Sequence, residues 1–290
     1  MFLLRCLDVR RLQSSFVAVE DSATTPGGVE SAAVSAAVAL VLKLSEARFT
    51  PLFMTALEWS RARAEGCARP LAFFRLVSAL AAALRSVFVP FFRHLLTDCV
   101  AFLEEQPADG ARPKKKSRAV AGQDPLARVS FQLRTEVVRS LGCCFLHDAV
   151  GFLDEARFNS LLRPLVLQLT LEVPADVTPD EVADMDAVLV DSIFQMAQNV
   201  RQDTLWRPLN RSVLLATRSE QVRPRRLGLA VVARLVESLA EEYLILLPET
   251  LPFLAELMED ADEEVEAAAR QLVTSLSALA EEDVAELLAS

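Results

Sequence analysis

The chain has 290 residues, of which 52% are hydrophobic and only eight are glycine. A chain of this length buries roughly three quarters of its unfolded surface, and scarce glycine argues against hairpin-rich folds and phosphate-binding glycine loops. The net charge of −10 is uneven, because residues 241–290 hold 14 acidic side chains and one basic side chain, so the average acidity does not identify a partner.

Cysteine content and hydropathy indicate the kind of cellular compartment in which we expect the protein. The five cysteines form no CxxC pair and are odd in number, which predicts buried thiols in a reducing compartment. Residues 1–11 hold only short apolar runs broken by charges, which predicts no secretory signal. The longest run of small apolar residues, 32–42, has about half the length of a membrane span, so we expect no membrane segment.

The sequence predicts helices along most of the chain. Residues 20–28 are rich in Ser, Thr, Pro and Gly and predict a loop, whereas residues 106–123 are a basic low-complexity run and predict disorder. The capping box from Thr178 to Glu181 is a specific start signal for the helix that follows. The predicted helices cover residues 1–19, 29–44, 45–63, 69–105 with a division near Pro90, 125–147, 156–171, 179–200, two pairs within 206–279, and 282–288.

Residues 206–279 repeat a helix-pair pattern. Val222 is expected to be equivalent to Val265, which lies 43 residues later. Two helices per unit with a period near this value are typical of HEAT or armadillo repeats. The last pair carries one apolar stripe on each helix; the expected stripes are Leu247, Leu251, Leu254 and Met258, then Val265, Ala268, Leu272, Leu276 and Leu279.

Prolines recur at a similar interval beside bulky apolar residues. Proline is tolerated in the first turn of a helix, where its missing N–H has no partner, so we expect these prolines to mark helix starts. The alternative is chance spacing among 14 prolines. The gaps are 39, 74, 44 and 44 residues, between Pro51, Pro90, Pro164, Pro208 and Pro252.

The second helices of the last two pairs differ in polarity. Residues 225–240 are apolar on nearly every side, which predicts a helix covered from both directions. Residues 263–279 have one apolar stripe and a charged back, as a terminal repeat requires. The predicted fold is all-α: a HEAT-like α-solenoid of antiparallel helix pairs with a capping C-terminal repeat. Its predicted parts are N-terminal helical pairs over 1–105, a disordered basic linker over 106–123, and C-terminal HEAT-like repeats over 124–290.

Several stretches resemble the nucleolar HEAT repeat-containing protein 1 family. They are KLSEARFTPLFMTALEWS, FFRLVSALAAALRSVFVPFFRHLL, LWRPLNRSVLLATRS and, most specifically, LLPETLPFLAELMEDADEEVEA. The resemblance runs from Lys43 to Leu276 and points to the C-terminal region of that family. It implies a non-enzymatic scaffold of the small-subunit processome, in the nucleolus. The implied partners are other processome proteins, a box C/D small nucleolar ribonucleoprotein and pre-ribosomal RNA, with a role in ribosomal DNA transcription as well, and no small-molecule substrate.

Residues that could carry chemistry are sparse. His147 follows Cys143 and Cys144 by four and three residues, but zinc would need further ligands. His94 and Asp98 are one helical turn apart without a positioned nucleophile, which predicts a surface pair. No P-loop or nucleophile elbow is present in the sequence. We therefore expect no catalytic residue, no metal site and no cofactor.

Basic clusters are the best candidates for binding. Arginine forks match phosphate oxygens, so an arginine-lined surface could contact RNA backbone. The alternative is that these arginines cover the seams between repeats and pair with the acidic last repeat. The candidate contact residues are Arg201, Arg207, Arg211, Arg218, Arg223, Arg225 and Arg226.

The run RPKKKSR is a candidate nuclear import signal, formed by Arg112, Lys114, Lys115, Lys116 and Arg118. The alternative is a plain disordered linker. For the whole chain, a HEAT-type nuclear transport adaptor that binds basic cargo is the second hypothesis, although the acidity is concentrated at one end. An enzyme is the third, and it would need a polar pocket with converging titratable groups.

Overall fold

The computed structural model describes residues 6–8, 26–62, 66–105, 125–200 and 202–280. Over these residues it contains α-helices and short 3-10 helices and no strand. The chain divides into two compact units. The first comprises Met1–Val150 and Val173–Glu181, and the second comprises Gly151–Glu172 and Val182–Ser290.

The first unit is built around α5 (Ala68–Leu84), which packs against α3 (Pro26–Val41), α4 (Glu46–Arg61) and α7 (Pro125–Leu146). Residues 68–87 are long and apolar enough to cross a membrane by composition, but half of this segment is buried against its neighbours, as in the core helix of a globular unit. Phenylalanines from α4, α5 and residues 88–91 fill the core in mostly edge-to-face contacts, a favourable geometry for aromatic rings; the cluster includes Phe49, Phe53, Phe73, Phe88 and Phe91.

The predicted division of residues 69–105 is confirmed, but it lies before Pro90. Helix α5 ends at Leu84, where Arg85 adopts a positive φ of 52°. Two 3-10 helices, η2 (Arg85–Val87) and η3 (Val89–His94), then lead into α6 (Leu96–Glu104). Pro90 occupies the first turn of η3, where its missing N–H costs nothing.

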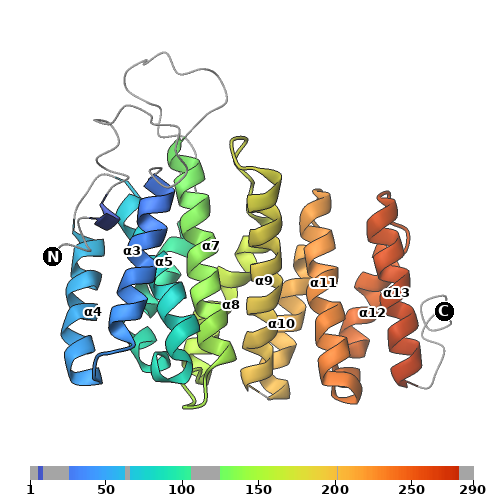
Figure 1. Ribbon diagram of the computed structural model, residues 1–290. Coiled ribbons are helices and arrows are strands. Elements are labelled where there is room, and N and C mark those ends of the chain that lie inside the picture. The colour runs from blue at the N-terminus through green and yellow to red at the C-terminus, as the bar shows by residue number, and fades with distance from the viewer. Residues whose placement is uncertain (1–5, 9–25, 63–65, 106–124, 201, 281–290) are drawn as a thin grey trace. The chain divides into compact units, whose positions relative to one another are not determined.

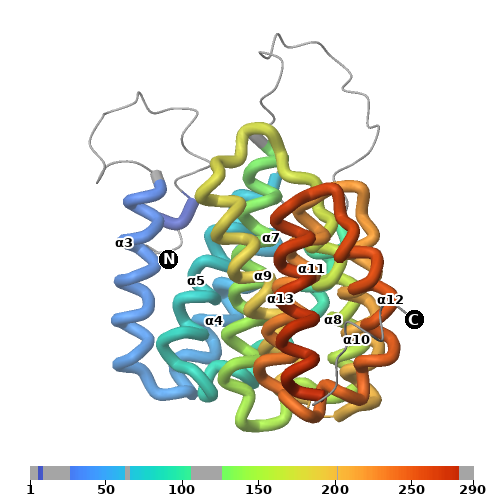
Figure 2. Tube along the Cα trace, turned by 90° about the vertical axis from the view of Figure 1, so that its right-hand side faces the viewer, coloured from blue at the N-terminus to red at the C-terminus, as the bar shows by residue number. Residues whose placement is uncertain are grey.

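The second unit has two layers of helices. Figures 1 and 2 show α11 (Val222–Leu239) beside α13 (Glu263–Ala280) in one layer, together with most of α9 (Pro179–Val200). The other layer holds α8, α10 and α12, which span Glu155–Leu167, Asp203–Ala216 and Leu247–Leu257. The 3-10 helices η4 (Gln168–Thr170) and η5 (Ala240–Leu246) complete the unit. Helix α11 contacts α10 on one side and α13 on another, so the prediction that it is covered from both directions is confirmed.

The capping box at the start of α9 is confirmed. The Glu181 N–H donates to Thr178 Oγ1 at 3.3 Å, and the Thr178 N–H donates to the Glu181 carboxylate at 2.9 Å. Two N–H groups that a helix end leaves unpaired are thereby satisfied. This local pairing needs no tertiary partner, which explains why the sequence predicts it well.

The prediction that the recurring prolines mark helix starts is wrong at four of five positions. Pro51, Pro164, Pro208 and Pro252 lie inside α4, α8, α10 and α12. Each helix extends at least a full turn before its proline, because apolar side chains there, such as Trp206, are buried. Burying a large apolar side chain stabilises by about 1.5–3 kcal/mol, and the burial of several such side chains offsets the lost hydrogen bond.

The predicted stripe on α12 is also wrong by about one position. Leu254 is buried as expected, but Leu247, Leu251 and Met258 are only half-buried. The buried side chains of α12 are Thr250, Phe253, Leu254 and Leu257, and Leu246 is buried just before the helix. Thr250 is polar, so the sequence pattern does not predict that it is buried. It can be buried because its hydroxyl has hydrogen-bond partners in other elements.

The equivalence of Val222 and Val265 is not supported. Val222 is 37% exposed, whereas Val265 is fully buried. Buried positions of α11 recur in α13 after 41 residues, so that Gly228 corresponds to Ala269 and Leu235 to Leu276. On α13 the buried part of the predicted stripe is Val265, Leu272 and Leu276, while Ala268 and Leu279 are half-buried.

The all-α, HEAT-like α-solenoid class of antiparallel helix pairs is confirmed. The outer side of α13 exposes Glu263, Glu264 and Arg270, as predicted for the capping pair. The basic run 106–123, most of residues 1–19 and residues 282–288 lie outside the described residues. The three-part division predicted from the sequence remains a prediction, and α7 packs with the first unit.

Candidate binding surface

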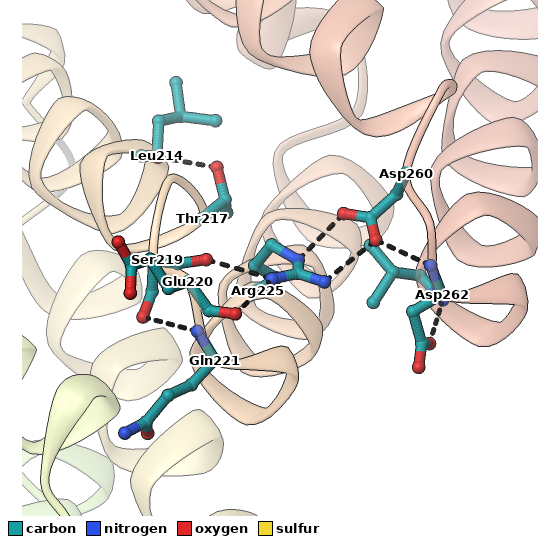
Figure 3. Close-up of polar contacts among 9 residues, drawn as sticks. Leu214, Thr217, Ser219, Glu220, Gln221, Arg225, Asp260 and Asp262 are labelled. Carbon is teal, nitrogen blue, oxygen red and sulfur yellow. Dashed lines mark hydrogen bonds and ion pairs between the residues drawn. The ribbon is translucent and has the colours of Figure 1, made fainter.

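Arg225 joins the two C-terminal helix pairs of the second unit. Its guanidinium donates to the carbonyls of Ser219 and Glu220 at 3.0 and 2.9 Å, and it lies 2.8 Å from Asp260 (Figure 3). Asp260 also accepts from the Asp262 N–H at 2.9 Å, and Asp262 accepts from the Val265 N–H at the start of α13. The arginine therefore connects the turn before α11 with the turn before α13.

Arg223 makes a comparable contact on the other side of α11. Its guanidinium donates to Asp186 of α9 at 2.6 Å and to the Leu171 carbonyl at 3.0 Å. Arg223 and Asp186 are 17% and 13% exposed, so most of their surface is removed from water. This arginine is occupied by contacts within the unit.

Arg218 and Arg226 form more exposed ion pairs between helix pairs. Arg218 contacts Glu256 through both ends of its fork and lies 4.3 Å over the ring centroid of Phe253. This pairing raises the pKa of Arg218 and lowers the pKa of Glu256. Arg226 donates to Glu264 of α13 at 3.0 Å. Four of the seven candidate arginines thus join neighbouring helix pairs, which is the alternative that the sequence left open.

Arg207 and Arg211 behave differently. Both are exposed on α10, one helical turn apart, and no ion pair joins either of them to an acidic side chain among the described residues. Arg201 lies outside the described residues. The predicted arginine cluster therefore separates into side chains that hold the unit together and side chains that remain available on its surface.

Arg163 is a surface arginine that the sequence analysis missed. It precedes Pro164 on α8, just as Arg207 precedes Pro208 on α10, and it is exposed. The repeated Arg-Pro dipeptide, 44 residues apart, is the signal that could have found it.

A buried polar network links α10, η5 and α12, and the sequence analysis missed it too. The Tyr243 hydroxyl donates to Asn210 Oδ1 at 2.9 Å and lies 3.1 Å from Thr250 Oγ1. The Asn210 amide donates to Glu249 at 2.8 Å. Burial raises the pKa of Tyr243 well above its usual value. The network satisfies polar groups inside an apolar core, where an unpaired one would be costly.

Asp98 and His94, considered for acid–base chemistry, both contact Arg61. Asp98 accepts from Arg61 at 2.9 Å, and the same arginine donates to the His94 carbonyl. Cys144 is buried on α7. Across the described ranges, no group of three or more His, Cys, Asp or Glu side chains could hold a metal ion.

Comparison with known proteins agrees with this architecture. Residues 1–153 match the family model of the BP28CT (NUC211) domain. The chain is 38% identical over 98% of its length to an uncharacterized protein of Arabidopsis thaliana (At3g06530), and 32% identical over 95% of its length to human HEAT repeat-containing protein 1. It is 26% identical over 94% of its length to U3 small nucleolar RNA-associated protein 10 of Schizosaccharomyces pombe. The chain spans only 13%, 12% and 15% of these three relatives, respectively.

The paired helices and their arginine-bridged seams define a helical-repeat protein of the HEAT type. The chain belongs to the BP28CT (NUC211) domain family. Most of the chain is homologous to a part of HEAT repeat-containing protein 1.

Proposed function

We propose that this chain is a non-enzymatic scaffold in ribosome biogenesis. The observation that carries the proposal is the alignment of 94% of the chain with a protein named for its association with U3 small nucleolar RNA. A second relative, from Neurospora crassa, has the same name and aligns with 82% of the chain. The finer form of the proposal is membership of the small-subunit processome in the nucleolus. There the chain would act in pre-ribosomal RNA processing, and in ribosomal DNA transcription, through contacts with processome proteins and a box C/D ribonucleoprotein.

The physical form of the second unit supports a scaffold. Ion pairs join neighbouring helix pairs, so that each pair of helices is linked to the next through arginine side chains. Glu256, Asp260 and Glu264 of the acidic C-terminal segment are already paired with arginines. This pairing weighs against the alternative of an adaptor that binds basic cargo through acidic side chains.

Co-purification tests the proposal. The tagged full chain is expressed in nucleolus-containing cells, and U3 small nucleolar RNA in the immunoprecipitate is measured against an unrelated small nuclear RNA. We expect enrichment of U3 RNA together with processome proteins. Recovery of both RNAs at background level would overturn the proposed role.

The basic segment extends the proposal to localisation. Arg112, Lys114, Lys115, Lys116 and Arg118 lie outside the described residues, and their role as a nuclear import signal is inferred from the sequence. Replacing the three lysines with glutamine should lower nuclear accumulation of a fluorescent fusion. Unchanged nuclear entry would favour a plain linker.

A further inference from the structure

We propose that Arg163, Arg207 and Arg211 form a phosphate-binding row that contacts the backbone of RNA. These three side chains, the arginine row, are exposed on the layer formed by α8, α10 and α12. The inference rests on the proposed function, and it names the part of the chain that would touch RNA. The row leaves out four arginines that the sequence analysis gave as candidates, because each is paired with an acidic side chain: Arg218, Arg223, Arg225 and Arg226.

The register of the two helices places the row on one face. Positions buried in α8 recur 44 residues later in α10: Leu161 corresponds to Leu205, and Leu165 to Leu209. Helices α8 and α10 contact each other directly. Arg163 and Arg207 therefore hold equivalent positions on neighbouring helices, both away from the core.

The spacing suits a chain of phosphates. Arg207 and Arg211 are four positions apart, which is about 6 Å along a helix axis, and the axes of neighbouring helices lie about 8–10 Å apart. Three guanidinium groups thus fall within a short stretch of surface. Phosphate charges follow one another closely along a nucleic-acid strand, so the row could contact several of them at once.

Several polar neighbours of the row suit an RNA backbone, although Asp203, exposed and one turn before Arg207, is acidic. Asn159, Ser160 and Thr204 are exposed on the same two helices, and amides and hydroxyls bind phosphate and sugar oxygens. A protein helix would need an apolar anchor. The candidate for such an apolar anchor is Leu215, which lies one turn beyond Arg211 and is 49% exposed. Substitution of Leu215 therefore tests whether the surface binds a protein instead.

The occupied arginines provide a matched control. Arg226, Arg234 and Arg270 lie on α11 and α13 and pair with Glu264, Asp191 and Glu266. A triple change of these residues to glutamine removes the same positive charge as R163Q/R207Q/R211Q, but from the other layer. Thermal melting of both variants identifies any loss of fold.

The experiment measures binding of the full chain to a labelled single-stranded RNA of mixed sequence across a salt series. Each phosphate contact on a single strand contributes about 0.7 to the slope of log K against log salt, so R163Q/R207Q/R211Q should reduce the slope by about 2 and weaken binding by about tenfold or more at low salt. The α11/α13 variant should keep the wild-type slope.

The contrary outcomes are distinct. Equal weakening of RNA binding in both triple variants would show a general effect of charge and would contradict the proposal that the arginine row contacts RNA. Unchanged RNA binding by R163Q/R207Q/R211Q would contradict it too. Binding of a glutamate-rich amphipathic peptide that weakens on Leu215→Ala, without RNA binding, would assign the surface to an acidic protein and overturn the proposal. If R163Q/R207Q/R211Q keeps the wild-type salt slope and still co-purifies U3 RNA, the scaffold role stands and RNA contact by the arginine row does not. If the wild type fails to co-purify U3 RNA yet shows the predicted salt slope, the scaffold role falls and the row stands.

Discussion

Asp260, in the turn after α12, holds Arg225, near the start of α11, with its carboxylate 2.8 Å from the guanidinium. The two side chains are 8% and 15% exposed, so the pair lies largely out of water. A charge that is buried and paired in this way depends on its partner, because neither group could be desolvated alone without a large cost. The pair therefore fixes how the last two helix pairs of the second unit pack.

We predict that Asp260→Ala lowers the free energy of unfolding of the second unit by about 3 kcal/mol, since it leaves the Arg225 guanidinium buried without its carboxylate. The chain has two tryptophans, Trp59 in the first unit and Trp206 in the second. Urea unfolding followed by Trp206 fluorescence in a Trp59→Phe background reports on the second unit alone.

The matched control for that measurement is Glu264→Ala. It breaks the Arg226–Glu264 pair, whose side chains are 53% and 74% exposed. Exposed pairs contribute less than about 1 kcal/mol, so the urea midpoint should move only slightly. Equal shifts for the two variants would mean that the Arg225–Asp260 pair has no special role.

Gly228→Ala should destabilise α11 through overpacking. A Cβ at this position would lie 2.5 Å from Thr217 Cγ2 and 3.3 Å from the Val213 carbonyl oxygen of α10. Inserting a methyl group into a tightly packed interior costs about 1–3 kcal/mol, which exceeds the helix propensity that alanine gains over glycine, about 1 kcal/mol.

A second substitution tests that explanation. Thr217→Ser removes the clashing methyl group and keeps the hydroxyl that donates to the Leu214 carbonyl. The double variant should regain most of the stability that Gly228→Ala loses, measured by the same Trp206 signal. If the two losses simply added, close approach of α10 and α11 would not be the reason for this glycine.

The helices of the chain could be predicted from periodicity, but the register of α12 could not. Its core face includes Thr250, whose polarity makes that face look exposed in the sequence. Tyr243 and Asn210 satisfy the threonine, and they come from other elements of the unit. A local pattern contains no information about such tertiary partners.

The same limit applies to the candidate site. Dense arginine in the sequence could be recognised, but charge density does not show which side chains face an acid on a neighbouring helix. Arg223 and Arg225 are in contact with Asp186 and Asp260, which lie 37 and 35 residues away in the chain. Arg163 lies outside the arginine-rich stretch of the sequence. Its one link to Arg207 in the sequence is that each arginine directly precedes a proline.

Tyr243, the one tyrosine of the chain, should make stability depend on alkaline pH. Burial raises the pKa of its hydroxyl in the folded state above its usual value of 10.0. The protonated form is therefore favoured by folding, and the stability that this contributes is complete below pH 10 and is lost as the pH rises above it, by up to about 1.4 kcal/mol per pH unit.

Absorbance of the phenolate provides the measurement. It should stay low in the folded chain above pH 10 and rise together with the loss of helical circular dichroism. The urea-unfolded chain, as the control, should titrate near 10. Tyr243→Phe should abolish this component and lower stability at neutral pH by about 1–2 kcal/mol, because Asn210 Oδ1 loses its donor. A phenolate that forms near pH 10 while the fold is intact would contradict the prediction.

Glu181 should make the first unit sensitive to acid. Partial burial raises the pKa of this carboxyl, but donors from the Thr178 N–H, Gln132, Arg128 and the Thr178 hydroxyl outweigh it and lower the pKa from 4.5 to about 2. The ionised form is favoured by folding, so its contribution is complete above pH 4.5 and is lost as the pH falls toward 2. Because the side chain is a quarter exposed, we expect about 1–2 kcal/mol after allowing for screening by solvent.

Glu181→Gln, which keeps the shape of the side chain, should therefore lower stability at neutral pH by this amount and flatten the profile between pH 4.5 and 2. Trp59 fluorescence in a Trp206→Phe background follows the first unit through urea unfolding at each pH. Asp180→Asn is the neighbouring control, because Asp180 is exposed in the first turn of α9 and should leave the slope of the profile intact. If Asp180→Asn flattened the acid limb as much as Glu181→Gln does, the acid sensitivity would come from the general charge at the helix start and not from the hydrogen bonds between α7 and the capping box.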